Sequence, residues 1–291
     1  ISRSASGGRV LRASILETEA IRSFMKRHGI EACIHLAGES TVEGGQEDPA
    51  RTFSVNVQGT VSVLECARAV PLERVIVAST SQVYGAHSSP CDETSPLHAS
   101  RPYEASKACA DLIAQSYARS FDLPVLIPRF VNTYGPGDTH VQRLTPRTKR
   151  GVLLGQPPTM WGGDVKREYL YIDDAVEAFL QLLNVPWARV GRRGVFNVGT
   201  EQPVSVHEVI RKTLEIAGSS FSIRRVADER RDEVPLQSVS TARARNILGW
   251  APRVSLDAGL RATIAWHAVA LRNVAAAQEP HRSEHVLDRS S

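Results

Sequence analysis

The sequence predicts an α/β fold in which one parallel sheet carries helices on both of its faces. Helix-like and strand-like segments alternate along the first half of the chain, and the strand-like segments are short, continuous apolar runs. Such runs are typical of strands buried on both faces, and their alternation with helices is typical of βαβ units. With 291 residues, of which 42% are hydrophobic, the chain is long and apolar enough to bury a core of this kind.

Each element is assigned from its hydrophobic period and from the residues at its ends. Pro102 suits the first turn of a helix, and Ser205 with Glu208 three residues later has the spacing of a capping box. Beyond Pro136, prolines and glycines separate shorter elements. In chain order the predicted elements are a helix over 17–28, a strand over 32–37, a helix over 52–69, a strand over 74–78, a helix over 102–120, a strand over 124–127, a helix over 173–183, a strand over 194–198, and helices over 205–217, 241–248 and 256–271.

Composition excludes several classes of function. The 35 basic and 31 acidic residues give a formal charge of +4, which is too balanced for a nucleic-acid-binding protein. Short basic pairs such as Arg192-Arg193 are expected to be solvated surface, with local anion binding as the alternative. No run of 18 apolar residues occurs, so no membrane span is expected. The four cysteines lack metal-ligand spacing, which predicts no metal site and favours a reducing cytoplasm.

The most informative pair of residues is Tyr103 and Lys107, which lie four apart and therefore share one face of a helix. A positive charge beside a phenol favours the phenolate, so Tyr103, whose ordinary pKa is about 10, is expected to act as a base nearer neutral pH. Three hydroxyl residues, 79–81, follow the strand over 74–78, at the sheet edge where ligands bind. Alone they would be read as loop residues, but beside a base they are candidates for assisting proton removal from an alcohol.

Further motifs follow in a fixed order. The segment RFVNTYGP at 129–136 comes after the YxxxK pair, and the remaining motifs are HLAGES at 35–40, NVQGT at 56–60, REYLYIDD at 167–174, NVGT at 197–200 and LGWAP at 248–252. Together these segments resemble the extended short-chain dehydrogenase/reductase family, specifically its nucleotide-sugar epimerase/dehydratase branch. The resemblance spans residues 9–272 and implies a Rossmann-type sheet with a smaller C-terminal substrate lobe.

The resemblance also implies the domain organisation. A partial dinucleotide-binding Rossmann domain is expected over 1–136, with 168–200 returning to it. The substrate-binding lobe is expected over 137–167 and 201–274, and a disordered tail over 275–291.

Each residue that matches a family motif has an implied role. Tyr103 is implied to be the catalytic base, Lys107 to hold the nicotinamide ribose and lower the tyrosine pKa, and Thr80 to hydrogen-bond the reacting hydroxyl. The implied cofactor contacts are Leu36, Ala37, Gly38, Asn56, Ser79, Tyr103 and Lys107. The implied substrate contacts are Thr80, Ser81, Gln82, Asn132, Arg167 and Arg230. Arginine suits phosphate geometry, although for Arg230 a surface role is equally open because Arg231 is adjacent.

The chain departs from the family at its start, where no glycine-rich GxxGxxG turn occurs. That turn cradles the dinucleotide pyrophosphate in the family. The chain is therefore expected to be truncated and to lack the first strands of the sheet. Residues near Val10 are expected to form a strand that an unfilled gap separates from the strand near Ile34. Such a chain is expected to fold poorly and to bind a dinucleotide weakly or not at all.

A second departure concerns the reaction. Family members that dehydrate or decarboxylate their substrates carry an acidic residue one or two places after the catalytic Ser/Thr, whereas this chain has Ser81 and Gln82. A neutral glutamine is neither a general acid nor a general base. The sequence therefore favours a 4-epimerase-like enzyme that transiently oxidises C4 of a nucleotide-sugar. A 4,6-dehydratase, a decarboxylase and a 4-ketoreductase remain alternatives. The amino-acid sequence of the segment 103–117 most resembles that of nucleotide-hexose 4,6-dehydratases.

The cofactor and partners follow from the same resemblance. The expected cofactor is NAD or NADP, and the sequence leaves the choice between them open. The expected substrate is a nucleotide-diphosphate sugar, and a homodimer is expected to form through the helices over 52–69 and 102–120. From another class of function, a non-catalytic remnant that binds a nucleotide or a partner is the alternative.

Overall fold

The structure, a computed structural model, describes residues 8–86, 90–161, 164–191, 193–227 and 234–278. Its centre is a parallel sheet in the order β1 (Ala32–His35), β2 (Arg74–Val77), β4 (Val125–Phe130) and β9 (Val195–Val198). The short strand β3 (Ser79–Thr80) follows β2 and pairs in parallel with the end of β4. The predicted parallel sheet is thus confirmed.

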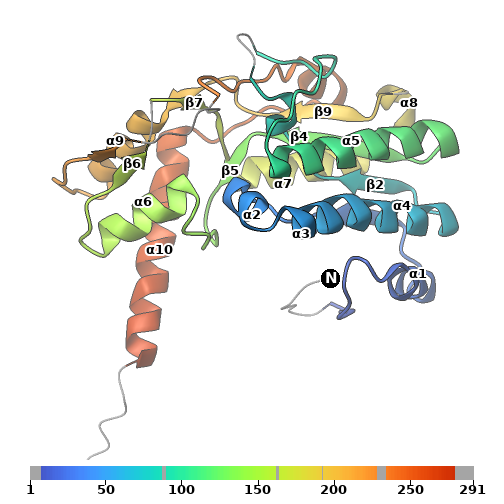
Figure 1. Cartoon of the computed structure of the whole chain (residues 1–291), viewed down its shortest axis with the longest axis horizontal. Coiled ribbons are helices and arrows are strands. Elements are labelled where there is room, and N and C mark those ends of the chain that lie inside the picture. Colours follow the sequence, from blue (N-terminus) through green and yellow to red (C-terminus); the bar gives the residue numbers. More distant parts are fainter. Residues whose placement is uncertain (1–7, 87–89, 162–163, 192, 228–233, 279–291) are drawn as a thin grey trace, which may run out of the picture.

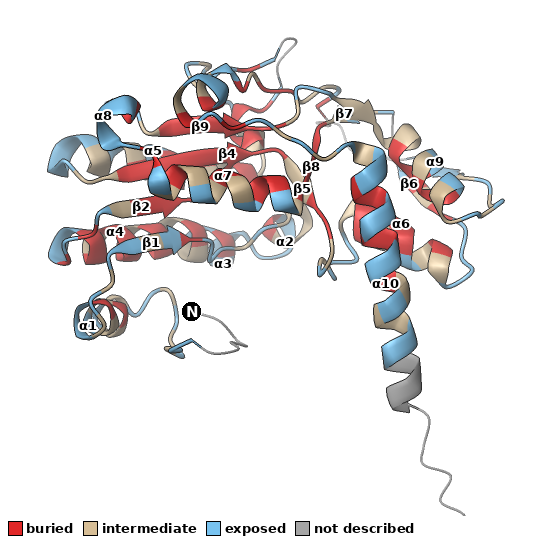
Figure 2. Cartoon of the chain, turned by 180° about the vertical axis from the view of Figure 1, so that it is seen from behind, coloured by how far each residue is buried: buried red, intermediate tan, exposed pale blue. Residues whose placement is uncertain are grey.

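Helices cover both faces of this sheet, as Figures 1 and 2 show from opposite sides. One face carries α7 (Ile172–Asn184). The other carries α2 (Val42–Glu47), α3 (Pro49–Phe53), the π-helical turn η1 (Ser54–Gln58), α4 (Gly59–Ala69) and α5 (Pro102–Phe121). Outside α4 lies α1 (Thr18–Arg27).

Two hydrophobic clusters fill the two sides because successive strand residues point to opposite faces. Ile76 and Leu126 pack in one cluster together with Ala178 of α7. Val75 and Val125 pack in the other, which also contains residues of α1, α4 and α5. Continuous apolar strands were predicted for this reason, and the burial of both strand faces confirms that reading.

The remaining elements form a second lobe and the connections to it. Figure 1 shows α10 leaving this lobe and running away from the sheet. The other described elements are η2 (Ser81–Tyr84), β5 (Asn132–Tyr134), α6 (Leu144–Leu153), β6 (Thr159–Trp161), β7 (Lys166–Arg167), β8 (Tyr169–Tyr171), α8 (Trp187–Val190), β10 (Val204–Ser205), α9 (Val206–Ile216), β11 (Arg224–Val226), η3 (Ala244–Leu248) and α10 (Leu256–Gln278). The predicted cap of α9 is present, since the Ser205 hydroxyl accepts from the Glu208 amide at 3.1 Å.

The expected strand near Val10 is wrong, because residues 9–14 form no strand or helix. The expected gap beside it is absent from the described sheet, in which β1 and β2 pair directly and β1 is the edge strand. Since β1 has a neighbour on one side only, Ile34 keeps 39% of its surface exposed.

Three helices differ from their predicted bounds. The helix expected over 52–69 begins at Pro49 and contains the π-helical turn η1, and most of the one expected over 241–248 is the π-helical turn η3. The last helix continues from Leu271 to Gln278, because its alanine-rich end favours helix. The predicted disordered tail over 275–291 therefore starts inside α10, and its residues 279–291 lie outside the described part of the chain.

Candidate active site

A cleft of about 380 Å³ opens where β3 and β4 end, between the sheet and the second lobe. The carboxyl ends of parallel strands are the usual place for a ligand in an open α/β sheet. The walls of the cleft include most of the predicted catalytic and substrate-binding residues, namely Thr80, Gln82, Tyr103, Asn132 and Arg167, and also Ser79, which was expected to contact the cofactor.

Tyr103 lies in the first turn of α5, which the sequence positions tightly. Pro102 begins the helix, and the Glu104 carboxylate accepts from the Arg101 backbone N–H at 3.3 Å and from its guanidinium at 2.6 Å. Helix α2 packs closely on this turn, since a Cβ on Gly45 would lie 2.9 Å from the Tyr103 Cβ. The ring is held in the cleft wall and is 7% exposed.

The pKa of Tyr103 is raised, because burial disfavours the phenolate. A hydrogen bond with the Thr80 side chain and the positive charge of Arg143 oppose this effect. Lys107 is not among the causes of this shift, and its expected lowering of the Tyr103 pKa stays a prediction. Its ammonium instead donates to the Ala78 carbonyl at 2.5 Å.

Lys107 is itself perturbed. Burial lowers its pKa to about 8, while the nearby Asp111 carboxylate raises it. An ammonium group has three N–H donors, and the Ala78 carbonyl uses one of them. Lys107 does not line the 380 Å³ cleft, and its expected contact with the nicotinamide ribose stays a prediction.

A buried polar network lies directly beneath the candidate catalytic residues. Asp111, one helical turn beyond Lys107, accepts two hydrogen bonds of 2.8 Å from Arg129 and one of 2.7 Å from the Ser79 hydroxyl. Arg129 also donates to the Tyr84 hydroxyl at 2.8 Å, and Tyr84 donates to Asn197 at 2.7 Å. The Ser79 hydroxyl is thus bonded to the buried network although the residue also lines the cleft, and its expected cofactor contact is not tested.

The remaining expected cofactor residues lie at the carboxyl end of β1. Asn56 makes all its side-chain hydrogen bonds to protein, with the Glu39 backbone at 2.8 and 3.1 Å and with the Ser106 hydroxyl at 2.8 Å. It fixes the loop after β1 to α5, and Gly38 leaves room for it, because a Cβ there would lie 2.8 Å from the amide oxygen. The neighbouring Leu36 and Ala37 are exposed.

The predicted substrate residues divide into three groups. Gln82, Asn132 and Arg167 line the cleft, and the Gln82 amide oxygen is buried without a hydrogen-bond partner. Ser81 is buried on the other side of the turn η2, toward Leu236–Val239, and does not line the cleft. Its expected substrate contact is therefore not supported. Arg230 lies outside the described residues.

Sequence reasoning missed Arg143, which the fold brings into the cleft wall from the loop before α6. Its guanidinium donates to the Ser40 hydroxyl at 2.9 Å and pairs with Asp138 at 3.2 Å. Ser40, in the HLAGES motif, lines the same cleft. No local pattern marks Arg143, because the contact joins segments 103 residues apart.

The residues present fit part of the expected cofactor. Tyr103 and Lys107 offer groups for the nicotinamide ribose, whereas the 291 residues contain no glycine-rich turn for the pyrophosphate. Over the residues described, no cluster of three or more His, Cys, Asp or Glu side chains is arranged to hold a metal ion. In the same ranges, no helix combines the length and hydropathy that a membrane crossing requires.

Comparisons with known proteins agree with the fold and the motifs. Residues 2–199 match the model of the NAD dependent epimerase/dehydratase family. A dTDP-glucose 4,6-dehydratase from Streptomyces griseus is 33% identical over 242 residues, covering 82% of this chain and 72% of the relative. The structure of a UDP-glucose 4-epimerase from Thermotoga maritima with UDP-glucose superposes with a TM-score of 0.83 at 28% identity, covering 89% and 84% of the two chains. DesIV, a dTDP-glucose 4,6-dehydratase from Streptomyces venezuelae with NAD bound, gives 0.81 at 31% identity, covering 92% and 80%.

Proposed function

This chain belongs to the NAD dependent epimerase/dehydratase family, and we propose that it is a nucleotide-sugar 4-epimerase-like enzyme. The observation that carries the proposal is the placement of Thr80 and Tyr103 in the wall of the same cleft, at the end of β3 and in the first turn of α5. Proton removal from a secondary alcohol needs a base within hydrogen-bond reach of the hydroxyl. Both groups lie where such a hydroxyl would enter.

Tyr103 takes the proton of the C4 hydroxyl on its phenolic oxygen, and Thr80 orients that hydroxyl. A bound NAD or NADP supplies the reversible acceptor for the C4 hydrogen. Because burial raises the Tyr103 pKa, the Thr80 hydrogen bond and the Arg143 charge are needed to favour the phenolate. Lys107, held by the Ala78 carbonyl, adds a positive charge on the same helix.

The substrate is proposed to be a nucleotide-diphosphate sugar. Arg167 and Arg143 place two guanidinium groups in the cleft wall, and their forked geometry suits diphosphate oxygens. Asn132, which donates to the Glu168 carbonyl at 3.3 Å, keeps its amide oxygen for a substrate hydroxyl.

The second candidate within the family is a 4,6-dehydratase, which the names of the relatives favour. Gln82 weighs against it, since a neutral amide in the cleft offers hydrogen bonds but no proton transfer. A decarboxylase is disfavoured for the same reason. A one-way 4-ketoreductase needs no acidic residue at the position of Gln82. Only an activity assay therefore distinguishes it from an epimerase.

Incubation with a panel of UDP-, GDP-, CDP- and dTDP-sugars in the presence of NAD or NADP distinguishes these reactions. Epimerisation gives a product of unchanged mass that chromatography separates from the substrate. Loss of water or of CO2 identifies a dehydratase or a decarboxylase, and net consumption of NADPH identifies a reductase. Turnover in none of these assays, with binding of the nucleotide-sugar retained, would favour the non-catalytic alternative.

The choice between NAD and NADP stays open, and the same panel run with each dinucleotide decides it. We also propose a homodimer that forms through α5 and its neighbour α4, which pack side by side. The exposed stripe of α5 includes Leu112, which is 52% exposed.

A further inference from the structure

A second cavity of the described residues lies away from the catalytic cleft, at the opposite end of β4. It has a volume of about 680 Å³, and Val125 and Ile127 near the start of β4 form part of its floor. The catalytic cleft instead takes Phe130 at the end of β4, and the two cavities share no lining residue. One ligand therefore cannot occupy both. A volume of this size suits a small molecule.

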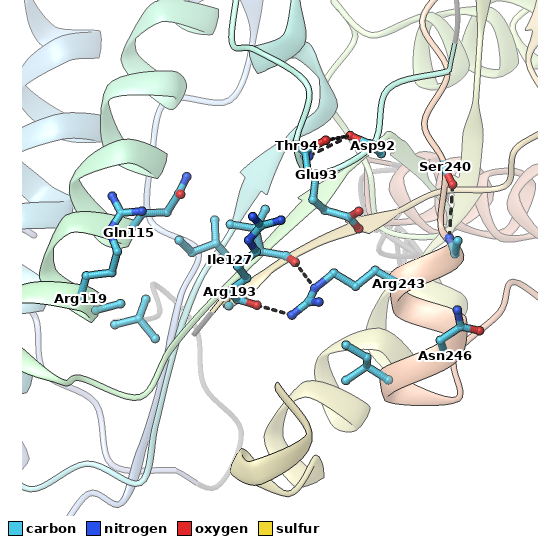
Figure 3. A pocket seen from close by; sticks show the side chains of 16 residues that line it. Asp92, Glu93, Thr94, Gln115, Arg119, Ile127, Arg193, Ser240, Arg243 and Asn246 are labelled. Atoms are coloured by element: carbon cyan, nitrogen blue, oxygen red, sulfur yellow. Dashed lines mark hydrogen bonds between the residues drawn. The ribbon is translucent and has the colours of Figure 1, made fainter. Parts of the chain in front are cut away.

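Three guanidinium groups line this cavity from three separate segments (Figure 3). Arg119 comes from the last turns of α5, Arg193 from the loop before β9, and Arg243 from the residue just before η3. Arg119 and Arg193 have exposed side chains that make no hydrogen bond or ion pair with any described residue. Both are free to turn toward a ligand.

Arg243 differs because the protein fixes it. Its guanidinium donates to the Val195 carbonyl at 3.1 Å, to the Val190 carbonyl at 2.9 Å and to the Arg193 carbonyl. Backbone carbonyls orient the group but do not neutralise it, and no carboxylate of the described residues lies within ion-pair distance. Burial lowers its pKa, the charge of Glu93 partly offsets this, and the charge of Arg193 lowers the pKa further. An anion in the cavity would offset both lowering effects.

The two acidic residues of the cavity lining make hydrogen bonds with neutral donors and form no ion pair with the three arginines. Asp92 accepts hydrogen bonds from Thr94 and Ser95 in its own turn, at 2.6 to 3.2 Å. The Glu93 carboxylate accepts a hydrogen bond of 2.7 Å from the backbone N–H of Asn197 in β9. The lining holds three arginines and two carboxylates, so a small excess of positive charge remains over the aliphatic floor.

We propose that this cavity is a second ligand site, which binds a small phosphate-bearing molecule. The arginines hold the phosphate, since the guanidinium fork matches two phosphate oxygens. The uncharged part of the ligand lies on Val125, Ile127 and Val195, each buried beneath the cavity. The site does not depend on the reaction proposed for the cleft.

Isothermal titration of the 291-residue chain with inorganic pyrophosphate at low ionic strength tests the proposal. The double variant Arg119→Gln/Arg193→Gln is expected to bind pyrophosphate at least about tenfold more weakly, because it loses two charge-assisted contacts. Both side chains are exposed, so folding is expected to be unaffected.

Two control variants locate the binding. Arg27→Gln/Arg261→Gln removes the same charge from exposed arginines outside both cavities, and Arg143→Gln removes an arginine of the catalytic cleft. Each is expected to retain at least one pyrophosphate site of wild-type affinity. The proposal is overturned if wild type shows no binding at about 1 mM ligand. It is equally overturned if the Arg119/Arg193 variant binds like wild type, or if the charge-matched control weakens binding as much.

Discussion

The Asp111 carboxylate accepts a hydrogen bond of 2.7 Å from the Ser79 hydroxyl and so joins helix α5 to strand β3. Asp111 is held in turn by Arg129, and both side chains of this ion pair are almost fully buried, at 0% and 2% exposure. Ser79 precedes Thr80, and Asp111 follows Lys107 by one helical turn. One buried ion pair therefore positions residues from both sides of the catalytic cleft.

Replacing Asp111 with asparagine is expected to destabilise the protein by about 3–5 kcal/mol, because Arg129 would remain buried without its counter-charge. Urea unfolding measures the loss. The matched control is Glu215→Gln, which breaks an exposed ion pair with Arg211 and should cost less than about 1 kcal/mol. Equal effects of the two variants would contradict the role assigned to the buried pair.

Tyr103→Phe is expected to lower turnover by about 10²–10⁴-fold, since it removes the group that takes the substrate proton. Thermal unfolding should change little, because the aromatic ring that fills the cleft wall remains. The control is Tyr117→Phe on the same helix, whose hydroxyl bonds Glu65 at 2.8 Å far along the helix from the cleft. Unchanged turnover in Tyr103→Phe would rule out Tyr103 as the base.

The pH dependence of turnover is expected to show an alkaline limb near pH 8, where Lys107 loses its proton. Burial places its pKa in the folded protein below that of the unfolded chain. The unfolded chain therefore binds more protons between about pH 8 and 10.5, and this group makes stability rise with pH in that window. Turnover thus falls while stability from this group rises. In Lys107→Arg the limb should move to higher pH, and a limb that stays in place would assign it to another group.

Lys149→Met is expected to stabilise the protein. The Lys149 side chain is 1% exposed, and its ammonium lies 5.2 Å from the Tyr134 ring centroid without a hydrogen bond or ion pair to any described residue. Burial lowers its pKa to about 7, which the negative charge of Asp138 partly offsets. Removing the charge should raise the melting temperature by about 2–4 °C for each kcal/mol gained.

The size of the stabilisation by Lys149→Met is expected to change little below pH 7 and to fall strongly above it. Below about pH 7 the lysine is charged in both states, so the folded state bears the whole desolvation cost. As pH rises from 7 toward 10.5 that cost disappears, so the gain from Lys149→Met should be larger at pH 6 than at pH 9. Lys26→Met, at an exposed position of α1, serves as control. A gain that is the same at both pH values would contradict the buried-charge explanation.

Leu112→Asp is expected to convert a homodimer into a monomer, because it places a charge in the exposed stripe of α5. Analytical ultracentrifugation measures the change. The control is Leu154→Asp, at a residue that is 50% exposed just after α6 and remote from α5. A wild-type monomer, or a Leu112→Asp dimer, would show that the helices pair differently or not at all.

The sequence by itself determined the parallel α/β fold and most of the catalytic face. The continuous apolar runs at 74–78 and 124–127 indicated strands covered on both sides, and the structure buries both. Thr80, Tyr103 and Lys107 were recognisable because helical spacing and a strand end are local properties of the chain. The missing strand near Val10 shows the limit of such reasoning, since a short apolar run becomes a strand only where a neighbour pairs with it.

Only the tertiary structure decided what surrounds these residues. The Lys107 ammonium turns to the Ala78 carbonyl, and the Tyr103 pKa is raised by burial, because desolvation depends on atoms that distant segments bring together. Arg143 enters the cleft from a loop with no motif, and Ser81 lies against Leu236–Val239 instead of lining the cleft. Local spacing thus gave the reacting groups, and long-range packing set their charges and their partners.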